Sequence, residues 1–340
     1  MSTPKQVLIA TLLDEEQLKG LQDQFGPQVA FHHHPIKQNE SIPADILQAA
    51  EVLYTNNYLP APEQAPRLRW VQFDQAGIET HLDHPLMAQP DLLATTTSGA
   101  NAPQVAEHAL SMMLALGHKL PNMLNDQSQH KWSARRLERY VPHELNGATV
   151  GMVGYGSIGQ YLAHLLQPFG VTILASRRDI MHPRDNDYLP EGYGDAEARL
   201  VRRLYPGKAL RTMLKECDFV VVAVPLTPET RGLISAKQLD AMHPTAFLVD
   251  VSRGGVVDQA ALLASLDGGK LAGAALDVFP EEPLPADSPM WEHPSVIISP
   301  HVAGLSQHYQ SRYMLLFAEN LRRFLAGVPL LNLVDPHRGY

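Results

Sequence analysis

Three side chains suited to proton transfer and anion binding follow apolar segments in the second half of the sequence. Arg253 comes after LVDVS, Glu282 lies in DVFPEEPLP, and His301 comes after VIISP. An arginine guanidinium can hold a carboxylate through two parallel hydrogen bonds. A histidine changes its charge near neutral pH and can give a proton to a carbonyl oxygen, and a nearby carboxylate favours its protonated form. These residue types predict acid–base chemistry on a small acid.

Each of the three residues also has an ordinary structural explanation. Arg253 could form a surface salt bridge, Glu282 could be solvated, and His301 could be a structural histidine. Spacing in the sequence does not show that they meet. Their shared position after predicted strands favours one site, because open parallel sheets bind ligands beyond the carboxyl ends of their strands.

A glycine-rich motif precedes these residues. GMVGYGSIGQ contains Gly154-x-Gly156-x-x-Gly159 between an apolar segment and a helical pattern. This context is typical of a loop that binds the pyrophosphate of a dinucleotide at a helix N-terminus. We therefore expect Gly154, Gly156, Ser157, Ile158 and Gly159 to contact a cofactor. The alternative is a glycine-rich turn without a ligand.

The residue that reads the ribose should follow the loop by about 20 residues. That position, 20 residues after Gly156, is Ser176, and Arg177 and Arg178 come next. A carboxylate there would bind the 2′-hydroxyl of NAD and repel a 2′-phosphate, whereas a serine and two arginines could hold the phosphate. The stretch predicts NADP(H), with NAD(H) still possible, unless both arginines are simply solvated.

Short apolar segments alternate with helical patterns along the chain, which indicates parallel sheets covered by helices. The 340 residues suffice for about two domains. Strands are predicted over residues 7–10, 29–31, 51–54, 69–72, 92–96, 149–153, 171–175, 219–224, 246–251, 272–276 and 296–298. Helices are predicted over residues 14–25, 101–120 and 307–326.

Composition limits the classes of partner. The 27 basic and 36 acidic side chains give a net charge of −9, which argues against binding along a nucleic-acid backbone. Cys217 is the only cysteine, so no disulfide can form within the chain. No apolar run approaches the ~20 residues of a membrane span, and the first apolar segment is short for a signal peptide. We expect a cytoplasmic protein without membrane partners.

Two further stretches are less specific. His32, His33 and His34 are adjacent, so on an extended segment they point to alternate sides and predict no metal site. Residues 180–207 are polar, rich in proline and glycine, and long for a connection. This stretch could be a surface insertion or could add contacts to a cofactor or an interface.

Five motifs, in this order, closely resemble the D-isomer-specific 2-hydroxyacid dehydrogenase family. They are GMVGYGSIGQ, CDFVVVAVPLTPETRGLI, FLVDVSRGGVVD, AALDVFPEEPLP and WEHPSVIISPHVAG. LRWVQFDQAGIE and ANAPQVAEHAL resemble segments of its substrate lobe and interdomain helix, so the likeness extends from about residue 66 to 325. The resemblance implies an α/β homodimer with a Rossmann-type cofactor domain over residues 101–301. A smaller flavodoxin-like substrate domain would be discontinuous, over residues 1–100 and 302–340.

The resemblance also implies roles for single residues. Arg253 would hold the substrate, His301 would donate a proton to it, and Glu282 would tune His301. The backbone amides of Gly77 and Ile78 would take the substrate carboxylate. Asp277 would bind the nicotinamide carboxamide, and further cofactor contacts would come from Val224, Pro225, Thr230 and Val251.

The expected activity is NADPH-dependent reduction of a small 2-keto acid, such as glyoxylate or hydroxypyruvate, to the D-2-hydroxy acid. Two departures from the family pattern are the missing acid at Ser176 and the 42 residues from Ser176 to Asp218, about twice the usual number. A dehydrogenase of another small anion, such as phosphite, is one alternative. A nucleotide-sensing corepressor or scaffold is another. Formate oxidation is disfavoured because relatives with that activity replace the Glu282–His301 pair.

Overall fold

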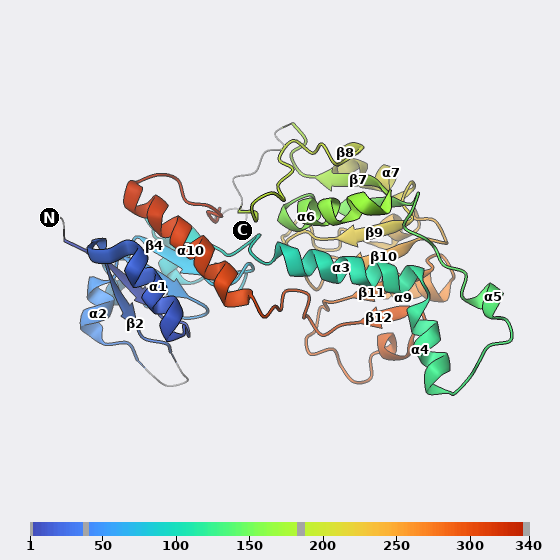
Figure 1. Cartoon of the computed structure of the whole chain (residues 1–340), viewed down its shortest axis with the longest axis horizontal. Helices are drawn as coiled ribbons and strands as arrows, with labels where there is room; N and C mark the ends of the chain where they lie inside the picture. Colours follow the sequence, from blue (N-terminus) through green and yellow to red (C-terminus); the bar gives the residue numbers. More distant parts are fainter. Residues whose placement is uncertain (1–2, 37–40, 182–187, 336–340) are drawn as a thin grey trace. The chain divides into compact units, whose positions relative to one another are not determined.

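The computed structural model describes residues 3–36, 41–181 and 188–335. Contacts divide them into two compact units. The first comprises the described residues of Met1–Asn101 and Ser306–Tyr340, together with Tyr188; the second comprises those of Ala102–Asp185 and Leu189–Leu305. Each unit is an α/β structure built on one parallel sheet (Figure 1).

The sheet of the first unit has five parallel strands in the order β2-β1-β3-β4-β5. This is the flavodoxin-like order. Its strands are β1 (Lys5–Ile9), β2 (Val29–His33), β3 (Val52–Thr55), β4 (Trp70–Phe73) and β5 (Leu93–Thr95). Its helices are α1 (Glu15–Phe25), α2 (Ala44–Ala49) and α10 (Tyr309–Ala326). Helix α1 begins where the Asp14 side chain accepts a hydrogen bond from the Gln17 amide.

Both faces of this sheet are covered. Val7 and Ile9 of β1 lie in one buried cluster with side chains of α1 and α10, including Phe317. Leu8, between them, lies in a second cluster with Leu47 of α2. Alternate residues of one strand therefore enter opposite cores, which explains why these strands are apolar almost throughout.

The second unit has seven parallel strands in the order β12-β11-β10-β9-β6-β7-β8. The sheet reverses its direction of growth between β6 and β9, and such a switch point is where doubly wound sheets bind their ligands. The strands are β6 (Thr149–Val153), β7 (Thr172–Arg177), β8 (Arg203–Pro206), β9 (Phe219–Val222), β10 (Phe247–Asp250), β11 (Gly273–Leu276) and β12 (Val296–Ile298). The helices are α3 (Ala102–Gly117), α4 (Leu120–Ser128), α5 (Arg136–Arg139), α6 (Ser157–Leu166), α7 (Leu210–Leu214), α8 (Ala236–Leu239) and α9 (Gln259–Asp267).

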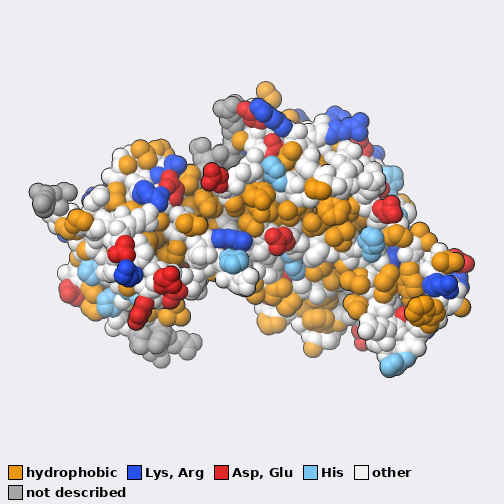
Figure 2. Space-filling view, viewed as in Figure 1, with side chains coloured by type: hydrophobic (Ala, Val, Ile, Leu, Met, Phe, Trp, Pro, Cys, Tyr) orange, Lys and Arg blue, Asp and Glu red, His pale blue; other side chains and the backbone are white. Residues whose placement is uncertain are grey.

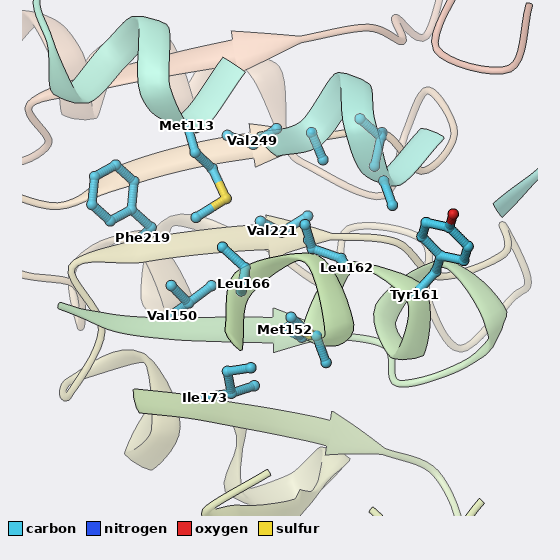
Figure 3. Close-up of a cluster of buried hydrophobic side chains, with 14 of the residues drawn as sticks. Met113, Val150, Met152, Tyr161, Leu162, Leu166, Ile173, Phe219, Val221 and Val249 are labelled. Atoms are coloured by element: carbon cyan, nitrogen blue, oxygen red, sulfur yellow. The ribbon is translucent and has the colours of Figure 1, made fainter. Parts of the chain in front are cut away.

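Helices α3 and α6 cover one face of this sheet. Figure 3 shows Met113 of α3 and Leu162 of α6 in one buried cluster with the strand residues Met152, Val221 and Val249, all of which are at most 2% exposed. Helices α7, α8 and α9 pack on the other face. The sequence prediction of a two-lobed α/β fold with a doubly wound sheet is confirmed.

The predicted helix over residues 101–120 is wrong at its end. Helix α3 stops at Gly117, and Lys119 adopts a left-handed conformation with φ 58° before α4 begins. Pro121, in the first turn of α4, has no amide hydrogen to continue the hydrogen-bond ladder of α3. The chain therefore leaves the axis of α3 after Gly117, although Leu120 continues the apolar pattern of that helix.

The stretch over residues 180–207 contains a strand that the sequence did not predict. β8 pairs in parallel with β7, with Ser176 opposite Tyr205. The four residues RLYP include an arginine and a proline, and too few residues alternate to indicate a strand. β7 also continues to Arg177, two residues beyond its predicted end.

Candidate cofactor site and active site

The glycine loop joins β6 to α6. Gly154 has φ +102°, and a Cβ added there would lie 2.6 Å from the carbonyl oxygen of Ala223. A Cβ on Gly159 would lie 2.6 Å from the Gly154 carbonyl oxygen, because the helix packs directly on the loop. A Cβ on Gly156 would meet nothing within 4 Å. The first and third glycines are thus needed by the fold, whereas the second leaves open space.

The open space at Gly156 lies at the N-terminus of α6. Gly156 is the N-cap residue, and Ser157 and Ile158 begin the ten-residue helix. Glycine has no side chain to cap the first amides of a helix, so these donors suit an anionic group. The three glycines therefore fit the pyrophosphate of a dinucleotide, with the roles that such loops assign to them.

The end of β7 lies beside the glycine loop. The Gly154 amide donates to the Ser176 carbonyl oxygen at 3.1 Å, and Val153 is paired with Ser176 across the strands. Ser176 is buried, Arg177 is half-buried and Arg178 is exposed. The Thr227 side chain, together with the backbone and the positive charge of Arg178, lowers the pKa of Glu229. Arg178 therefore lies near the loop that follows β9.

Residues after β9 and β10 complete the surroundings of the loop. A Cβ on Gly154 would lie 2.8 Å from Val224 Cγ1, so Val224 borders the glycine loop. The Thr230 hydroxyl donates to the Pro225 carbonyl oxygen at 2.6 Å and closes the turn after β9. Val251 is buried directly after β10. These residues lie at the carboxyl ends of neighbouring strands, on the side of the sheet expected for a ligand.

His301 and Glu282 are hydrogen bonded to each other. His301 Nδ1 lies 2.7 Å from Glu282 Oε2. The other carboxylate oxygen, Oε1, accepts a hydrogen bond from the Phe279 amide at 2.9 Å. His301 and Glu282 are 44% and 35% exposed, so the pair is accessible to a small molecule. The carboxylate is held by its own turn and orients the imidazole.

Arg253 belongs to a turn that abuts the turn leading to Glu282. A Cβ on Gly254 would lie 1.9 Å from the Phe279 carbonyl oxygen, which leaves no room for any other residue. Arg253 Nη1 donates to the Ser252 carbonyl oxygen at 2.8 Å. The structure thus brings the turns after β10 and β11 together, next to the His301 turn after β12.

Asp277 holds the backbone around His301. Its carboxylate is 3% exposed and accepts hydrogen bonds from the Ser299 hydroxyl (2.6 Å) and the amides of Val302 (2.9 Å) and Ala303 (3.0 Å). The His301 amide donates to the Asp277 carbonyl oxygen at 2.9 Å. His301 itself has φ 54°, a left-handed conformation that non-glycine residues seldom adopt. Asp277 therefore stabilises this conformation, whatever else it binds.

Three polar residues near this site were missed by the sequence analysis. His108 of α3 lies 3.1 Å from the Ser299 hydroxyl, which is itself bonded to Asp277. Burial raises the pKa of Asp250 to about 7, although its hydrogen bonds from Ser252 act in the opposite direction. The sequence positions of His108 and Ser299 do not indicate that they lie near Asp277. Asp250 gave no functional signal because it is the last residue of an apolar strand.

Gly77 and Ile78 lie in the first unit, in the segment after β4. Ile78 is 1% exposed, and its carbonyl oxygen accepts a hydrogen bond from the His81 amide at 2.8 Å. Nearby, burial raises the pKa of Asp74. The role of Gly77 and Ile78 in substrate binding stays a prediction.

The three adjacent histidines contact residues of the first unit. A ring nitrogen of His32 lies 2.8 Å from Gln6 Oε1, and one of His33 lies 3.0 Å from the Thr11 carbonyl oxygen. In the part of the chain that the structure describes, no three His, Cys, Asp or Glu residues are grouped to hold a metal ion. No described helix combines the length and apolar character needed to cross a membrane.

The chain is similar to proteins of known family. Residues 110–303 match the family model "D-isomer specific 2-hydroxyacid dehydrogenase, NAD binding domain". A glyoxylate reductase of Korarchaeum cryptofilum is 34% identical over 278 residues, which are 80% of this chain and 78% of that protein. A D-3-phosphoglycerate dehydrogenase of Synechocystis sp. is 31% identical over 77% of this chain, which spans only 44% of that relative's length.

A solved structure extends the similarity over the whole chain. It is a D-isomer specific 2-hydroxyacid dehydrogenase from Xanthobacter autotrophicus Py2 in complex with NADPH and MES. It superposes with a TM-score of 0.80 and 27% identity and covers 100% of both chains. These matches confirm the resemblance that the motifs indicated: the chain belongs to the D-isomer specific 2-hydroxyacid dehydrogenase family.

Proposed function

We propose that the protein is an NADPH-dependent reductase that converts a small 2-keto acid into the D-2-hydroxy acid. The hydrogen bond of 2.7 Å between His301 and Glu282 is the observation that carries this proposal. It gives the site a proton donor whose ring is fixed by a carboxylate, as carbonyl reduction requires. Glyoxylate and hydroxypyruvate are the substrates we favour, and the similarity to a glyoxylate reductase supports this choice.

In the proposed reaction, each residue of the triad has a separate task. The nicotinamide cofactor, when bound, supplies the hydride that reduces C2 of the keto acid. His301 gives the proton from Nε2 to the keto oxygen, while Nδ1 stays bonded to Glu282. Glu282 compensates the positive charge of the imidazolium before the transfer. Arg253 holds the substrate through its guanidinium, and the amides of Gly77 and Ile78 take the carboxylate.

Cofactor binding is proposed for the loop and strand ends described above. Gly154, Gly156, Ser157, Ile158 and Gly159 would hold the pyrophosphate, and Asp277 would bind the carboxamide. Val224, Pro225, Thr230 and Val251 would line the remaining surface. In this scheme the second unit is the cofactor domain and the first unit is the substrate domain.

The preference for NADPH over NADH is proposed from the end of β7. Ser176 removes the carboxylate that would repel a 2′-phosphate, and Arg177 and Arg178 supply positive charge beside it. The Xanthobacter relative was crystallised with NADPH, which supports the same choice. A hydrogen bond to a charged group contributes about 1.5–3 kcal/mol, enough for a preference of tenfold or more.

A homodimer is proposed on the basis of the exposed apolar segment over residues 120–141. Its large hydrophobic side chains are between 39% and 87% exposed: Leu120, Met123, Leu124, Trp132, Leu137 and Val141. Figure 2 shows hydrophobic side chains at the surface over α4 and α5. A second copy of the chain would cover apolar area that monomeric proteins seldom leave exposed.

The proposed activity is tested with purified protein, NADPH or NADH, and a panel of 2-keto acids that includes glyoxylate and hydroxypyruvate. Oxidation of D-3-phosphoglycerate and of phosphite with NADP+ or NAD+ completes the panel. We expect NADPH-dependent reduction of at least one keto acid, with the D-enantiomer as product on chiral chromatography. Cofactor binding without turnover of any keto acid would contradict the proposal.

The cofactor preference is tested with Arg177→Asp combined with Arg178→Ala. We expect the KM for NADPH to rise at least tenfold and the KM for NADH to change less than threefold. Arg211→Ala is a matched control, because Arg211 is an exposed arginine of α7 and lies outside the proposed cofactor site. An equal loss with both cofactors would show that the two arginines do not read the 2′-phosphate.

A further inference from the structure

The glycine loop carries a tyrosine that the cofactor motif does not require. Tyr155 stands between Gly154 and Gly156 and is 1% exposed, so its ring is buried. Its hydroxyl donates to Asp195 Oδ2 at 2.6 Å. Burial, together with this bond to a carboxylate, raises the pKa of Tyr155, so the phenol keeps its proton and remains a donor.

Asp195 lies in the long stretch between β7 and β8, in what we call the Asp195 segment (residues 193–200). It is 7% exposed. Besides the Tyr155 hydroxyl, its carboxylate accepts the amides of Arg199 (2.7 Å) and Leu200 (2.9 Å), so both oxygens have donors. The Asp195 amide donates to Gln160 Oε1 of α6 at 2.7 Å. One residue therefore connects the segment to the loop and to the helix that follows it.

Packing reinforces these bonds. The ring of Tyr193 stacks on Tyr161 of α6, with centroids 4.2 Å apart and an angle of 22° between planes. Ala198 and Leu200 pack against the buried cluster that contains Tyr155 and Tyr161. The segment is thus part of the core that supports the first turns of α6. These contacts tie residues 193–200 to the core of the second unit, within the stretch over residues 180–207 for which the sequence left a surface insertion and added cofactor or interface contacts as alternatives.

We propose that Asp195 is a positioning residue that fixes the glycine loop through Tyr155 and thereby sets the affinity for the nicotinamide cofactor. The inference builds on the proposed function, since it concerns the same cofactor site. Asp195 and Tyr155 are both buried, whereas the space at Gly156 is open, so the two side chains act on the loop from the protein interior. Without the bond between Tyr155 and Asp195, the loop backbone could move. The amides proposed to bind the pyrophosphate would then no longer be held in one arrangement, and such a displacement weakens binding even when every contact residue is present.

The decisive variant is Tyr155→Phe, which removes one oxygen and keeps the buried ring. We expect the dissociation constants of NADPH and NADH to rise equally, by about tenfold, as the loss of one charge-assisted hydrogen bond suggests. At saturating cofactor, kcat and the KM for the keto acid should change less than twofold. Titration calorimetry without keto acid gives the affinities, and circular dichroism checks the fold.

Tyr193→Phe is the matched control, because it makes the same change in a ring of the same segment that contacts the rings of Tyr161 and His164. We expect its dissociation constants to stay within twofold of those of the unmodified protein. Asp195→Asn should weaken cofactor binding, and the double variant Tyr155→Phe/Asp195→Asn should be no weaker than the more affected single variant, because both act through one bond. If Asp195→Asn does not fold, Tyr155→Phe and its control decide the question.

Three results would overturn the proposal. They are an unchanged affinity in Tyr155→Phe with a lower melting temperature, an equal effect of Tyr193→Phe, and an effect on NADPH alone. The last would mean that the bond acts on the 2′-phosphate instead of the pyrophosphate. Failure of the reductase proposal is separate, because it appears as cofactor binding without turnover.

Discussion

At the scale of single residues, the conformation of His301 shows how much of the site is fixed before any ligand binds. A left-handed conformation costs a non-glycine residue about 1–3 kcal/mol. Here it is stabilised by Asp277, which accepts from Val302 and Ala303 on one side and from Ser299 on the other. The imidazole is then held by Glu282. Residue type and position after predicted strands identified His301 and Glu282, but the backbone conformation of His301 depends on contacts that no local pattern encodes.

His301→Asn tests the proposed proton donor while sparing the backbone, since asparagine tolerates the left-handed region better than most residues. We expect kcat to fall at least 100-fold, in line with the usual contribution of a general acid. The dissociation constant of NADPH should change less than threefold in calorimetry. Retention of more than a tenth of the turnover would exclude His301 from proton transfer.

Asp250 predicts a pH dependence of stability. Its pKa in the folded protein is raised to about 7 by burial, whereas in the unfolded chain it is near the ordinary value of 3.8. A raised pKa favours the protonated form in the fold, so its contribution to stability is fully present below about pH 4 and is lost as the pH rises to 7. A difference of one between the pKa values of the two states corresponds to about 1.4 kcal/mol of stability.

Asp250→Asn removes this titration and keeps an acceptor for Ser252. We expect the variant to melt several degrees higher than the unmodified protein at pH 8 and within one degree of it at pH 4. Calorimetric melting curves between pH 4 and 8 measure the difference. A constant difference across this range would mean that the Asp250 carboxyl does not titrate there.

At the scale of elements, the loop between β6 and α6 contains two kinds of glycine. Gly154 and Gly159 are required by the packing of the fold, and Gly156 is required by the proposed ligand. A Cβ on Gly159 would meet a carbonyl oxygen at 2.6 Å, whereas one on Gly156 would meet nothing within 4 Å. The motif gave all three positions from the sequence alone. Only the structure shows which of the three positions have no room for a side chain even when no cofactor is bound.

This difference predicts opposite effects of two alanine substitutions. Gly156→Ala should fold with an unchanged melting temperature and bind NADPH at least 30-fold more weakly, because its methyl group would occupy the space of the pyrophosphate. Gly159→Ala should melt several degrees lower, because α6 would have to move away from the loop. Equal melting temperatures of the two variants would contradict this assignment.

Other elements show where sequence reasoning reaches its limit. The strands at Thr149–Val153 and Val296–Ile298 coincide with the predicted ones because both are short apolar segments of a parallel sheet. β8 escaped prediction because its four residues include a charged arginine and a proline, and too few of them alternate to indicate a strand. The predicted helix ran three residues past Gly117 because Leu120 extends the apolar pattern of α3, although it begins α4.

At the scale of the whole molecule, the proposed homodimer can be tested through the mass of the protein in solution. Leu137 is 80% exposed and lies in the apolar segment proposed as the dimer contact. Leu137→Asp should place a charge in that contact and shift the mass measured by light scattering from twice 37.5 kDa towards a single chain. Leu12→Asp, in the first unit and also exposed, should leave the mass unchanged. A dimer that survives Leu137→Asp would place the contact elsewhere.

The two outer strands of the seven-stranded sheet have a consequence for how such copies can join. β12 has three residues and β8 has four, and β8 ends in Pro206, which has no amide hydrogen to offer a further strand. Arg203 adds a charge to the same edge, and short, charged, proline-bearing edges resist the addition of strands from other molecules. The sheet therefore cannot readily be continued from one copy into the next. Growth into open-ended fibrils is disfavoured at the same edges for the same reason.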